Sequence, residues 1–596
     1  MDFYSFYTGN CFDAHQWLGA HPQGEGFVFR TFAPSADRIS IIGDCTGGEE
    51  VPMEKVGDGN FYECTLPNAR EGQRYQYRIY HSQGCTDHCD PYGYGMELRP
   101  DHQSVLRRLD YAFQDEDWMK NRTDRKKGPL NIYEVHLGSW RRKGEGLNDF
   151  YNYEELAGML IPYVKEAGYD HIELLPICEH PADESWGYQN TGFFSPTSRY
   201  GTAVQLKKFI DACHQAGIGV ILDFVPVHFA MDDYGLRRYD GTFLYEYPNS
   251  DVGLSEWGSC NFMHSRGEVR SFLQSAVSYW LGEYHFDGIR FDAISRILYW
   301  QGDEKRGVNG MAVRFVQGMN QELKARYPGC MLIAEDSTDF PGVTKDVGSG
   351  GLGFDYKWDM GWMHDTLSVF QMPPAERREK YHKLSFSMMY FYNDRFLMPF
   401  SHDEVVHGKA TILQKMNGDY DQKFPQARAL YLYMMTHPGK KLNFMGNEIG
   451  HFREWDEKRE QDWELLQYPL HDGFFHYIQE LNRIYETHPA LYAADYEKEG
   501  FQWLDCQPGE GCTYAFLRAG KGEQLAVVLN LNDRPEEDYS LRIPGAGRLE
   551  LLLDSDWQCW GGQSLPCAGA VAVPQAGEFF LHLAPFSGKV YRVIER

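Results

Sequence analysis

The chain has 596 residues, 42% of them hydrophobic and 24% charged, which is typical of a globular protein with two to four domains. Its formal net charge of −27 argues against a nucleic-acid or membrane-surface partner, because an acidic chain repels phosphate and anionic lipid. We find neither an apolar run that could span a bilayer nor an N-terminal signal peptide.

The chain has thirteen cysteines, an odd number whose spacing shows no disulfide framework. This favours reduced thiols in a cytoplasmic protein. His81, Cys85, His88 and Cys89 are residue types that bind zinc, but they are crowded and lack paired spacing. We interpret the two cysteines as free surface thiols near a turn and predict no metal site there.

Residues 1–115 are predicted to form an N-terminal β-sandwich. Apolar and polar residues alternate over 27–32, 39–42 and 75–80, with glycine- and proline-containing turns between them. The polar, basic stretch 120–127 that follows is predicted to be a linker. From residue 491 to 596 the β pattern returns, over 513–517, 525–529 and 590–591, and predicts a C-terminal β-sandwich.

Between these ends, over residues 116–490, strand patterns alternate with helical patterns. The predicted helices are 154–167, 204–216, 269–284, 312–327 and 425–437. The predicted strands are 131–135, 171–175, 219–224, 288–291, 331–334, 353–356, 396–399 and 441–444. Eight strands with intervening helices predict a (β/α)8 TIM barrel. A doubly wound open sheet is the alternative, and 353–356 is the least regular strand.

Charged residues follow four of the predicted strands. Catalytic groups of a barrel gather at the carboxyl ends of its strands. Those four strand ends carry Asp223 with His228, Arg290 with Asp292, Glu335, and His402 with Asp403. One charged strand end would be unremarkable, but four at matching positions predict an active site.

Two of these carboxyl groups have surroundings that suit opposite roles. Arg290 and Asp292 are two apart on a strand and share a face, so the guanidinium would keep Asp292 ionised, as a nucleophile must be. Glu335 follows an apolar run that would raise its pKa and suit a proton donor. Such a pair performs glycoside chemistry. Taken singly, a structural ion pair and a loop-starting carboxylate are equally good interpretations.

The four strand ends also resemble a known family. They read Asp223-Phe-Val-Pro-Val-His228, Gly288-Ile-Arg290-Phe-Asp292, Ala334-Glu335-Asp336-Ser337-Thr338 and Ser401-His402-Asp403-Glu404. These are similar to the four signature regions of family-13 glycoside hydrolases, and the last two resemble those of glycogen branching enzymes. The N-terminal part, with Phe32-Ala33-Pro34, resembles the family-48 carbohydrate-binding sandwich, for which glycan binding and a packing role both remain open.

The resemblance implies a role for each residue. Asp292 matches the nucleophile, Glu335 the general acid/base, and Asp403 the carboxylate that grips and distorts the donor sugar. The remaining five match residues that bind or support the sugar: His228 and His402 at its hydroxyls, Arg290 and Asp223 beside the nucleophile, and Tyr188 as an aromatic platform.

The implied activity is branching, in which an α-1,4-glucan is cleaved and the segment is moved to a 6-hydroxyl with retention. An α-glucan hydrolase on the same scaffold and a non-catalytic glycan-binding scaffold are the alternatives. Val227 stands where many α-amylases have an asparagine that ligates calcium, so we expect no metal and no cofactor. We expect a monomer whose partner is glycogen or another α-1,4-glucan.

Overall fold

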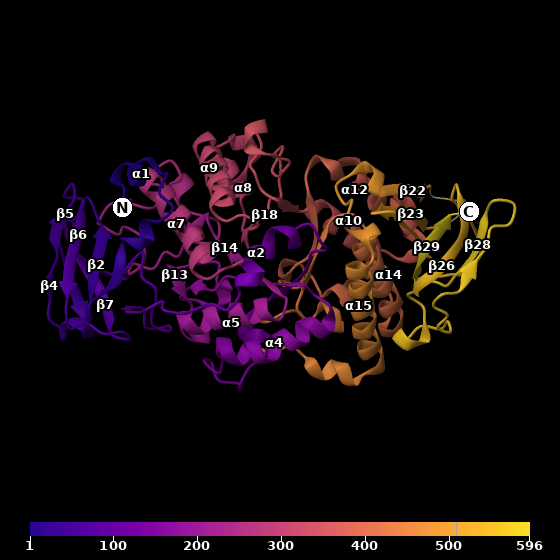
Figure 1. The fold of residues 1–596 in the computed structure, drawn as a ribbon, viewed down its shortest axis with the longest axis horizontal. Helices are drawn as coiled ribbons and strands as arrows, with labels where there is room; N and C mark the ends of the chain where they lie inside the picture. Colours follow the sequence, from indigo (N-terminus) through magenta and orange to yellow (C-terminus); the bar gives the residue numbers. More distant parts are fainter. Residues whose placement is uncertain (508, 510, 596) are drawn as a thin grey trace.

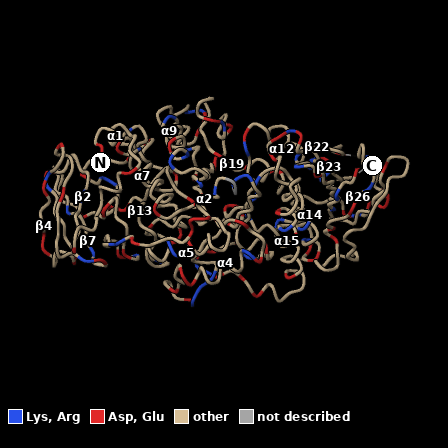
Figure 2. Tube along the Cα trace, in the orientation of Figure 1, with Lys and Arg blue, Asp and Glu red and all other residues tan. Residues whose placement is uncertain are grey.

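The computed structural model describes residues 1–507, 509 and 511–595. The molecule is elongated, with a β domain at each end and a barrel between them (Figure 1). Acidic and basic residues are interspersed along its whole length (Figure 2). Within the described residues, no helix is both long enough and apolar enough to cross a membrane.

The N-terminal domain is a sandwich of two antiparallel sheets. One sheet contains β1 (Gly19–Gln23), β2 (Gly26–Phe32), β6 (Phe61–Leu66) and β5 (Glu54–Val56). The other contains β4 (Val51–Pro52), β3 (Arg38–Gly43), β7 (Arg74–His81) and β8 (Gly84–His88), with β9 (Ser104–Val105) beside β7. Phe29 and Tyr75 meet edge to face between the sheets, with ring centroids 5.1 Å apart. The sequence-predicted sandwich is therefore confirmed.

The expectation that residues 1–115 are all β is wrong at the N-terminus. Helix α1 (Phe3–Thr8) is capped by the Asp2 side chain and packs on barrel helix α7 (Gly267–Glu283). The Ser271 hydroxyl donates to the Phe6 carbonyl at 2.9 Å, and Gln274 Nε2 donates to the Gly9 carbonyl at 2.9 Å. A helix this short depends on such tertiary contacts, which local sequence patterns do not reveal.

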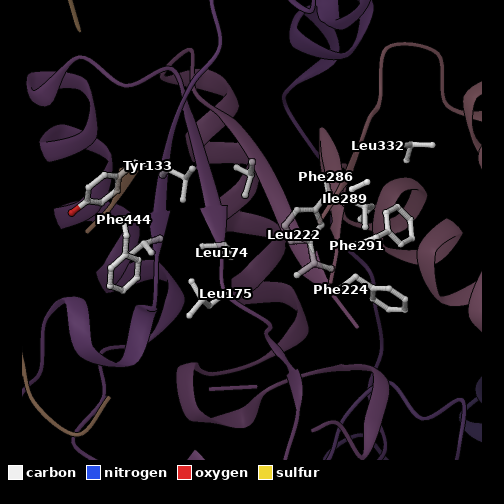
Figure 3. Close-up of a cluster of buried hydrophobic side chains, with 14 of the residues drawn as sticks. Tyr133, Leu174, Leu175, Leu222, Phe224, Phe286, Ile289, Phe291, Leu332 and Phe444 are labelled. Carbon is white, nitrogen blue, oxygen red and sulfur yellow. The ribbon is translucent and has the colours of Figure 1, made fainter. Parts of the chain in front are cut away.

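Eight parallel strands close into the central barrel. They are β10 (Asn131–Val135), β11 (His171–Leu174), β14 (Gly219–Phe224), β17 (Gly288–Phe291), β18 (Met331–Ala334), β19 (Tyr356–Trp358), β20 (Phe396–Phe400) and β21 (Lys440–Phe444). Because β21 pairs with β10, the alternative of an open sheet is excluded. Figure 3 shows Leu174, Leu222, Ile289 and Leu332, one buried side chain from each of four successive strands.

The sixth strand differs from its prediction. It begins at Tyr356, where the predicted strand ends, because Gly353 has a φ of +78° and turns the chain before the strand. Within residues 335–355 the only helical element is the 3-10 turn Val347–Ser349. The flank of the barrel between β18 and β19 therefore has no helix over it.

The larger helices around the barrel include the five predicted ones, α4 (Tyr153–Ala167), α5 (Ala203–Gln215), α7, α9 (Gly310–Arg326) and α14 (Tyr420–Thr436). Three others were not predicted, α10 (Met360–Gln371), α12 (His382–Tyr390) and α15 (Pro469–Thr487). Helix α4 begins with a capping box: the Asn152 side chain accepts from the Glu155 amide, and Glu155 reaches back to Asn152. Its end is fixed by Gly168 in the left-handed conformation.

The predicted linker at 120–127 is wrong, because most of it belongs to helix α2 (Glu116–Arg125). Two residues at its start are buried under the barrel. Trp118 Nε1 donates to Asp287 Oδ1 at 2.7 Å, and Asp115 Oδ2 is 2.7 Å from His214 Nδ1. These contacts join α2 to α5 and to the turn before β17.

The C-terminal domain is the predicted second β-sandwich. Its six-stranded sheet contains β22 (Phe501–Asp505), β23 (Thr513–Gly520), β24 (Glu523–Asn530), β29 (Ser587–Glu595), β26 (Ala546–Asp554) and β27 (Val571–Ala572). The facing pair is β25 (Glu536–Leu541) and β28 (Phe579–Leu583). Buried arginines join it to α14: Arg428 Nε donates to the Ser555 carbonyl at 2.6 Å, and Arg518 Nη1 donates to the Thr436 carbonyl at 2.7 Å.

Candidate active site

A fully buried arginine lies at the centre of the predicted site, at the carboxyl end of β17. Arg290 Nη1 donates to both oxygens of Asp223 at 2.8 and 2.9 Å, and to Asp292 Oδ1 at 2.7 Å. Its Nη2 is 3.7 Å from Glu335 Oε2. The indole ring of Trp358 lies beneath the guanidinium, with the Arg290 carbon 4.2 Å from its centroid. The structure thus brings together residues from three strand ends.

The two central carboxyl groups share a partly enclosed environment, each side chain being 15% exposed. Burial and the charge of Glu335 raise the pKa of Asp292, against the opposing effect of Arg290. Burial, with a contribution from Asp403, raises the pKa of Glu335. Arg290 donates to Asp292 at 2.7 Å but is 3.7 Å from Glu335, so it stabilises the ionised form of Asp292 more than that of Glu335.

Glu335 is held in position by the backbone. Its Oε2 accepts from the Ala293 amide at 2.7 Å, and its carbonyl accepts from the Ile294 amide at 3.0 Å. Ala293 has a positive φ of 46°, which aims this amide at the carboxyl group of the neighbouring strand. Glu335 is therefore tied directly to the loop that follows Asp292.

His402 is fixed by a carboxylate on the first strand of the barrel. Glu134 accepts from the His402 amide at 2.9 Å and lies 2.6 Å from His402 Nδ1. Asp403 Oδ1 is 3.3 Å from His402 Nε2. Burial lowers the pKa of His402, but Asp403 and Glu134 outweigh it and raise the pKa to about 9. At neutral pH this imidazole is doubly protonated.

Tyr188 lies between the histidine and the buried carboxylate. Its ring stacks on His402 at 5.6 Å between centroids, with the planes inclined by 22°. Its hydroxyl donates a short hydrogen bond to Asp223 Oδ2. The residue therefore has both an aromatic face and a polar contact inside the site.

A cleft of about 350 Å³ opens above these groups. It is lined by Tyr188, His228, Asp292, His402 and Asp403 from the predicted set, together with Glu184, Ser185, Trp186, Gln189, Trp257 and His407. Among the predicted carboxylates, Asp403 is the most accessible, at 44% exposure. Burial lowers the pKa of His228 to about 4, so this imidazole is neutral.

Several site residues were not singled out from the sequence. Glu134 holds His402, Trp358 backs Arg290, and Trp186 and Trp257 line the cleft. The signal for Glu134 was present: it is a carboxylate in the middle of an apolar strand, and such a residue requires a buried partner. The aromatic residues carried no comparable signal, because buried and cleft-lining rings look alike in a sequence.

The interpretation of the cysteine–histidine group is correct only in part. Cys85 is a free, exposed thiol on β8, but Cys89 is buried, and burial raises the pKa of Cys89 to about 12. His88 Nδ1 contacts the Gly235 carbonyl at 2.8 Å. Across the described residues, no group of three or more His, Cys, Asp and Glu side chains is arranged to hold a metal ion.

Three family models match this chain. Residues 17–93 match the carbohydrate-binding module 48 (isoamylase N-terminal domain), residues 155–236 the α-amylase catalytic domain, and residues 503–594 the α-amylase C-terminal all-β domain. These three matches follow the order of sandwich, barrel and sandwich in the structure.

Two similar curated proteins are both named 1,4-alpha-glucan branching enzyme GlgB. That of Bacillus subtilis (strain 168) is 41% identical over 99% of this chain and 99% of its own length. That of Oceanobacillus iheyensis is 43% identical over 94% of this chain and 92% of its own length.

The similar solved structures include two pullulanases. The enzyme from Anoxybacillus sp. LM18-11, complexed with maltotetraose, has a TM-score of 0.74 and 18% identity, and the match covers 99% of this chain and 89% of that one. The enzyme from Bacillus acidopullulyticus has a TM-score of 0.72 and 17% identity, covering 96% and 74%. At this identity the likeness concerns the fold alone.

Proposed function

The chain belongs to the 1,4-α-glucan branching enzymes of the α-amylase family, and we propose that Asp292 and Glu335 carry out the two chemical steps of its reaction. The enzyme binds an α-glucan, cleaves an α-1,4 linkage and transfers the released segment to a 6-hydroxyl, which forms an α-1,6 branch. We propose that its natural partner is glycogen and that it acts as a monomer.

In the first step, Glu335 donates its proton to the glycosidic oxygen while a carboxylate oxygen of Asp292 attacks the anomeric carbon. The C1–O bond breaks, the reducing-end part of the donor leaves, and a covalent glycosyl-enzyme remains on Asp292. In the second step, the acceptor 6-hydroxyl gives its proton to Glu335 and its oxygen attacks the same carbon, which releases Asp292. The configuration is retained, and we expect the two carboxyl groups to lie roughly 5–5.5 Å apart.

The observation that supports this division of roles is the asymmetric position of Arg290. Its Nη1 contacts Asp292 Oδ1 at 2.7 Å, whereas its Nη2 is 3.7 Å from Glu335. A charge-assisted hydrogen bond stabilises a carboxylate and not a carboxylic acid. Asp292 is thus suited to attack and Glu335 to protonate.

The other residues bind and orient the donor sugar. Asp403 and the doubly protonated His402 offer charged hydrogen-bonding groups, and His228 offers a neutral imidazole. Tyr188 provides an aromatic face for the sugar ring and holds Asp223, which in turn keeps Arg290 in place. No metal ion or cofactor is needed for any of these steps.

The division of roles is tested by trapping the intermediate. In Glu335→Gln the acid is lost, but a glycosyl fluoride donor needs no acid to expel fluoride, so the first step still proceeds. Mass spectrometry should find one glycosyl group on the peptide that contains Asp292. The matched control, Asp292→Ala, should take up no label. A label on any other carboxylate would contradict the assignment.

A further inference from the structure

A second cleft lies where the N-terminal segment meets two helices of the barrel. Its volume is about 440 Å³, which is within the range of small-molecule sites. Residues between 8 and 12 form one wall, and helices α7 and α9 form the others. Helices α1 and α7 pack together, and α9 lies beside α7 (Figure 1). Among the described residues, this cleft and the one above Asp292 have no lining residue in common, so the proposed reaction does not use it.

Two arginines line this cleft, and the first is held in place by the backbone. On α7, Arg270 Nη2 donates to the Thr8 carbonyl at 2.8 Å. Its Nη1 donates to the carbonyls of Ser265 at 3.0 Å and His264 at 3.4 Å. Gly9 makes room for the guanidinium, because a Cβ at residue 9 would lie 2.3 Å from Arg270 Nε. These hydrogen bonds fix the position of the group, but their acceptors are uncharged carbonyl oxygens.

The second arginine, Arg314 on α9, is exposed. Its Nη2 contacts the Met311 sulfur at 2.7 Å, and a thioether is a weak acceptor. Within the part of the chain that the structure describes, no carboxylate forms an ion pair with Arg270 or Arg314. Glu322, which also lines the cleft, is already paired with Arg326 at 2.7 Å. The cleft therefore contains two positive charges that no carboxylate neutralises directly.

The two positive charges are close enough to oppose each other. Burial lowers the pKa of Arg270; Glu268 acts against this effect, and the charge of Arg314 adds to it. Two like charges, one of them half-buried, cost free energy that an anion placed between them would recover. In a chain whose net charge is −27, such a pair is not explained by a general excess of basic residues.

The side chains of the cleft favour a phosphate group with an organic part attached. A guanidinium offers several N–H donors in one plane, which match the oxygens of phosphate. Thr8 and Asn10 add a hydroxyl and an amide beside the arginines. Met311 and Phe315 add apolar surface, against which an organic group can pack. A neutral sugar would leave both positive charges without compensation.

We propose that this cleft binds a small organic phosphate ester, with its phosphate between Arg270 and Arg314. Sugar phosphates and nucleotides share this chemistry, and the choice of probes distinguishes them. The site takes no part in cleavage or transfer of a glucan. The inference therefore does not depend on the roles proposed for Asp292 and Glu335.

The test uses Arg314→Gln, because Arg314 is exposed and, unlike Arg270, donates to no backbone group among the described residues. The matched control is Arg237→Gln, which removes the same charge from an arginine that is 37% exposed and does not line the cleft. Isothermal titration calorimetry on the full chain measures the binding of glucose 1-phosphate, adenosine 5′-monophosphate and inorganic phosphate. Glucose and adenosine are the uncharged counterparts of the two esters.

We expect at least one ester to bind the wild type at one molecule per chain, and the ester that binds shows whether the ligand is a sugar phosphate or a nucleotide. Arg314→Gln should raise its Kd by roughly 12- to 150-fold, the effect of losing a hydrogen bond to a charged group. Arg237→Gln should bind it as the wild type does.

Three results would overturn the inference. In the first, neither ester binds the wild type, or inorganic phosphate alone binds. In the second, Arg314→Gln binds the ester as tightly as Arg237→Gln does. In the third, Arg314→Gln weakens the binding of the uncharged counterpart as much as that of the ester, which would show that the phosphate is not what Arg314 recognises.

Discussion

Arg290 has two carboxylates on one of its nitrogen atoms and no contact with water, so its charge is shared between Asp223 and Asp292. A buried charge is tolerated only when it is paired and hydrogen bonded. Asp223 would provide this compensation throughout the proposed reaction, in which Asp292 loses its charge when it becomes glycosylated.

In the proposed mechanism, Asp292 and Glu335 are both needed in each half of the reaction. We predict that Asp292→Ala and Glu335→Gln each lower the branching rate by several orders of magnitude, with no loss of folding. The measurement is branch formation on amylose, with the melting temperature as control for the fold. Residual activity within about tenfold of the wild type in either variant would contradict the assignment.

The hydroxyl of Tyr188 gives a more specific prediction. Because it donates to the buried Asp223, Tyr188→Phe leaves one oxygen of this carboxylate with fewer hydrogen bonds. A lost hydrogen bond to a charged group is worth about 1.5–3 kcal/mol, so we expect kcat/KM to fall by roughly 12- to 150-fold. The kcat/KM of Tyr188→Ala should be lower still, because this variant also loses the aromatic ring. Steady-state kinetics of the two variants would separate the contribution of the hydroxyl from that of the ring. Full activity in Tyr188→Phe would show that the hydroxyl contributes nothing.

At the residue scale the sequence indicated the charged groups, including Arg290 and Asp223 beside Asp292, but gave no role to Glu134 or Trp358. Asp292 and Glu335 follow apolar strands directly, so their position could be predicted from the chain alone. Glu134 could not be connected to His402, because 268 residues separate them and the contact exists only once the barrel closes. Trp358 was hidden for a related reason: its strand is three residues long and begins after an unexpected glycine turn.

At the scale of elements, a buried ion cluster connects α2, α5 and the turn before β17. His214 lies between Asp115 at 2.7 Å and Asp287 at 2.8 Å, and its ring stacks on Trp118 at 4.9 Å. Burial lowers the pKa of His214, but the two carboxylates outweigh it and raise the pKa to about 9. The basic residues of 120–127 suggested a linker, whereas Asp115 and Trp118, just before them, belong to this buried cluster.

This cluster predicts how stability depends on pH. The folded pKa of His214 lies above its unfolded value of about 6.5, so its stabilisation is complete below that pH and is lost as the pH rises through about 9. We expect the melting temperature to decline over this range in the wild type. In His214→Gln this part of the decline should be absent.

The same variant also tests the size of the effect. Removing one partner of a buried charged cluster costs about 3–5 kcal/mol, because the remaining charges lose their compensation. His214→Gln should therefore unfold at a lower temperature than the wild type at pH 6. The neighbouring His285 is a useful comparison, because it contacts Asp115 at 2.9 Å but is more exposed. His285→Gln should therefore lower the melting temperature less than His214→Gln does. Equal effects would contradict the bridging role of His214.

The regular elements were the easier part of the fold to predict. Seven barrel strands start within one residue of their predicted positions, because buried parallel strands are short apolar runs with glycine or charged residues around them. Helices α10, α12 and α15 were not predicted, and at α1 and α2 the sequence was interpreted as β structure and as a linker. Helix α1 is six residues long and consists of aromatic residues, serine and threonine, and most residues of α2 are charged or polar. Neither sequence has the periodic apolar pattern by which a helix is predicted.

At the scale of the whole molecule, the barrel is held between two β domains (Figure 1). The C-terminal contact is made through the buried guanidiniums of Arg377, Arg428 and Arg518, which donate to carbonyl groups across the boundary. Such a boundary resembles a domain interior and should move as one piece with the barrel.

The molecule should work without a metal ion. The Val227 side chain has no oxygen to ligate calcium, and the proposed proton transfers need only carboxyl groups of the chain. We expect the branching rate in EDTA to equal the rate in buffer. A reproducible loss that one added metal restores would contradict this prediction.

The central claim is that a sugar hydroxyl, and not water, completes the reaction. The most direct measurement incubates the wild type with amylose and follows iodine staining, reducing ends and, after enzymatic debranching, the lengths of the released chains. We predict that staining falls and α-1,6-linked chains appear while reducing ends stay nearly constant. Reducing ends that rise in step with the loss of staining would show a hydrolase and contradict the account.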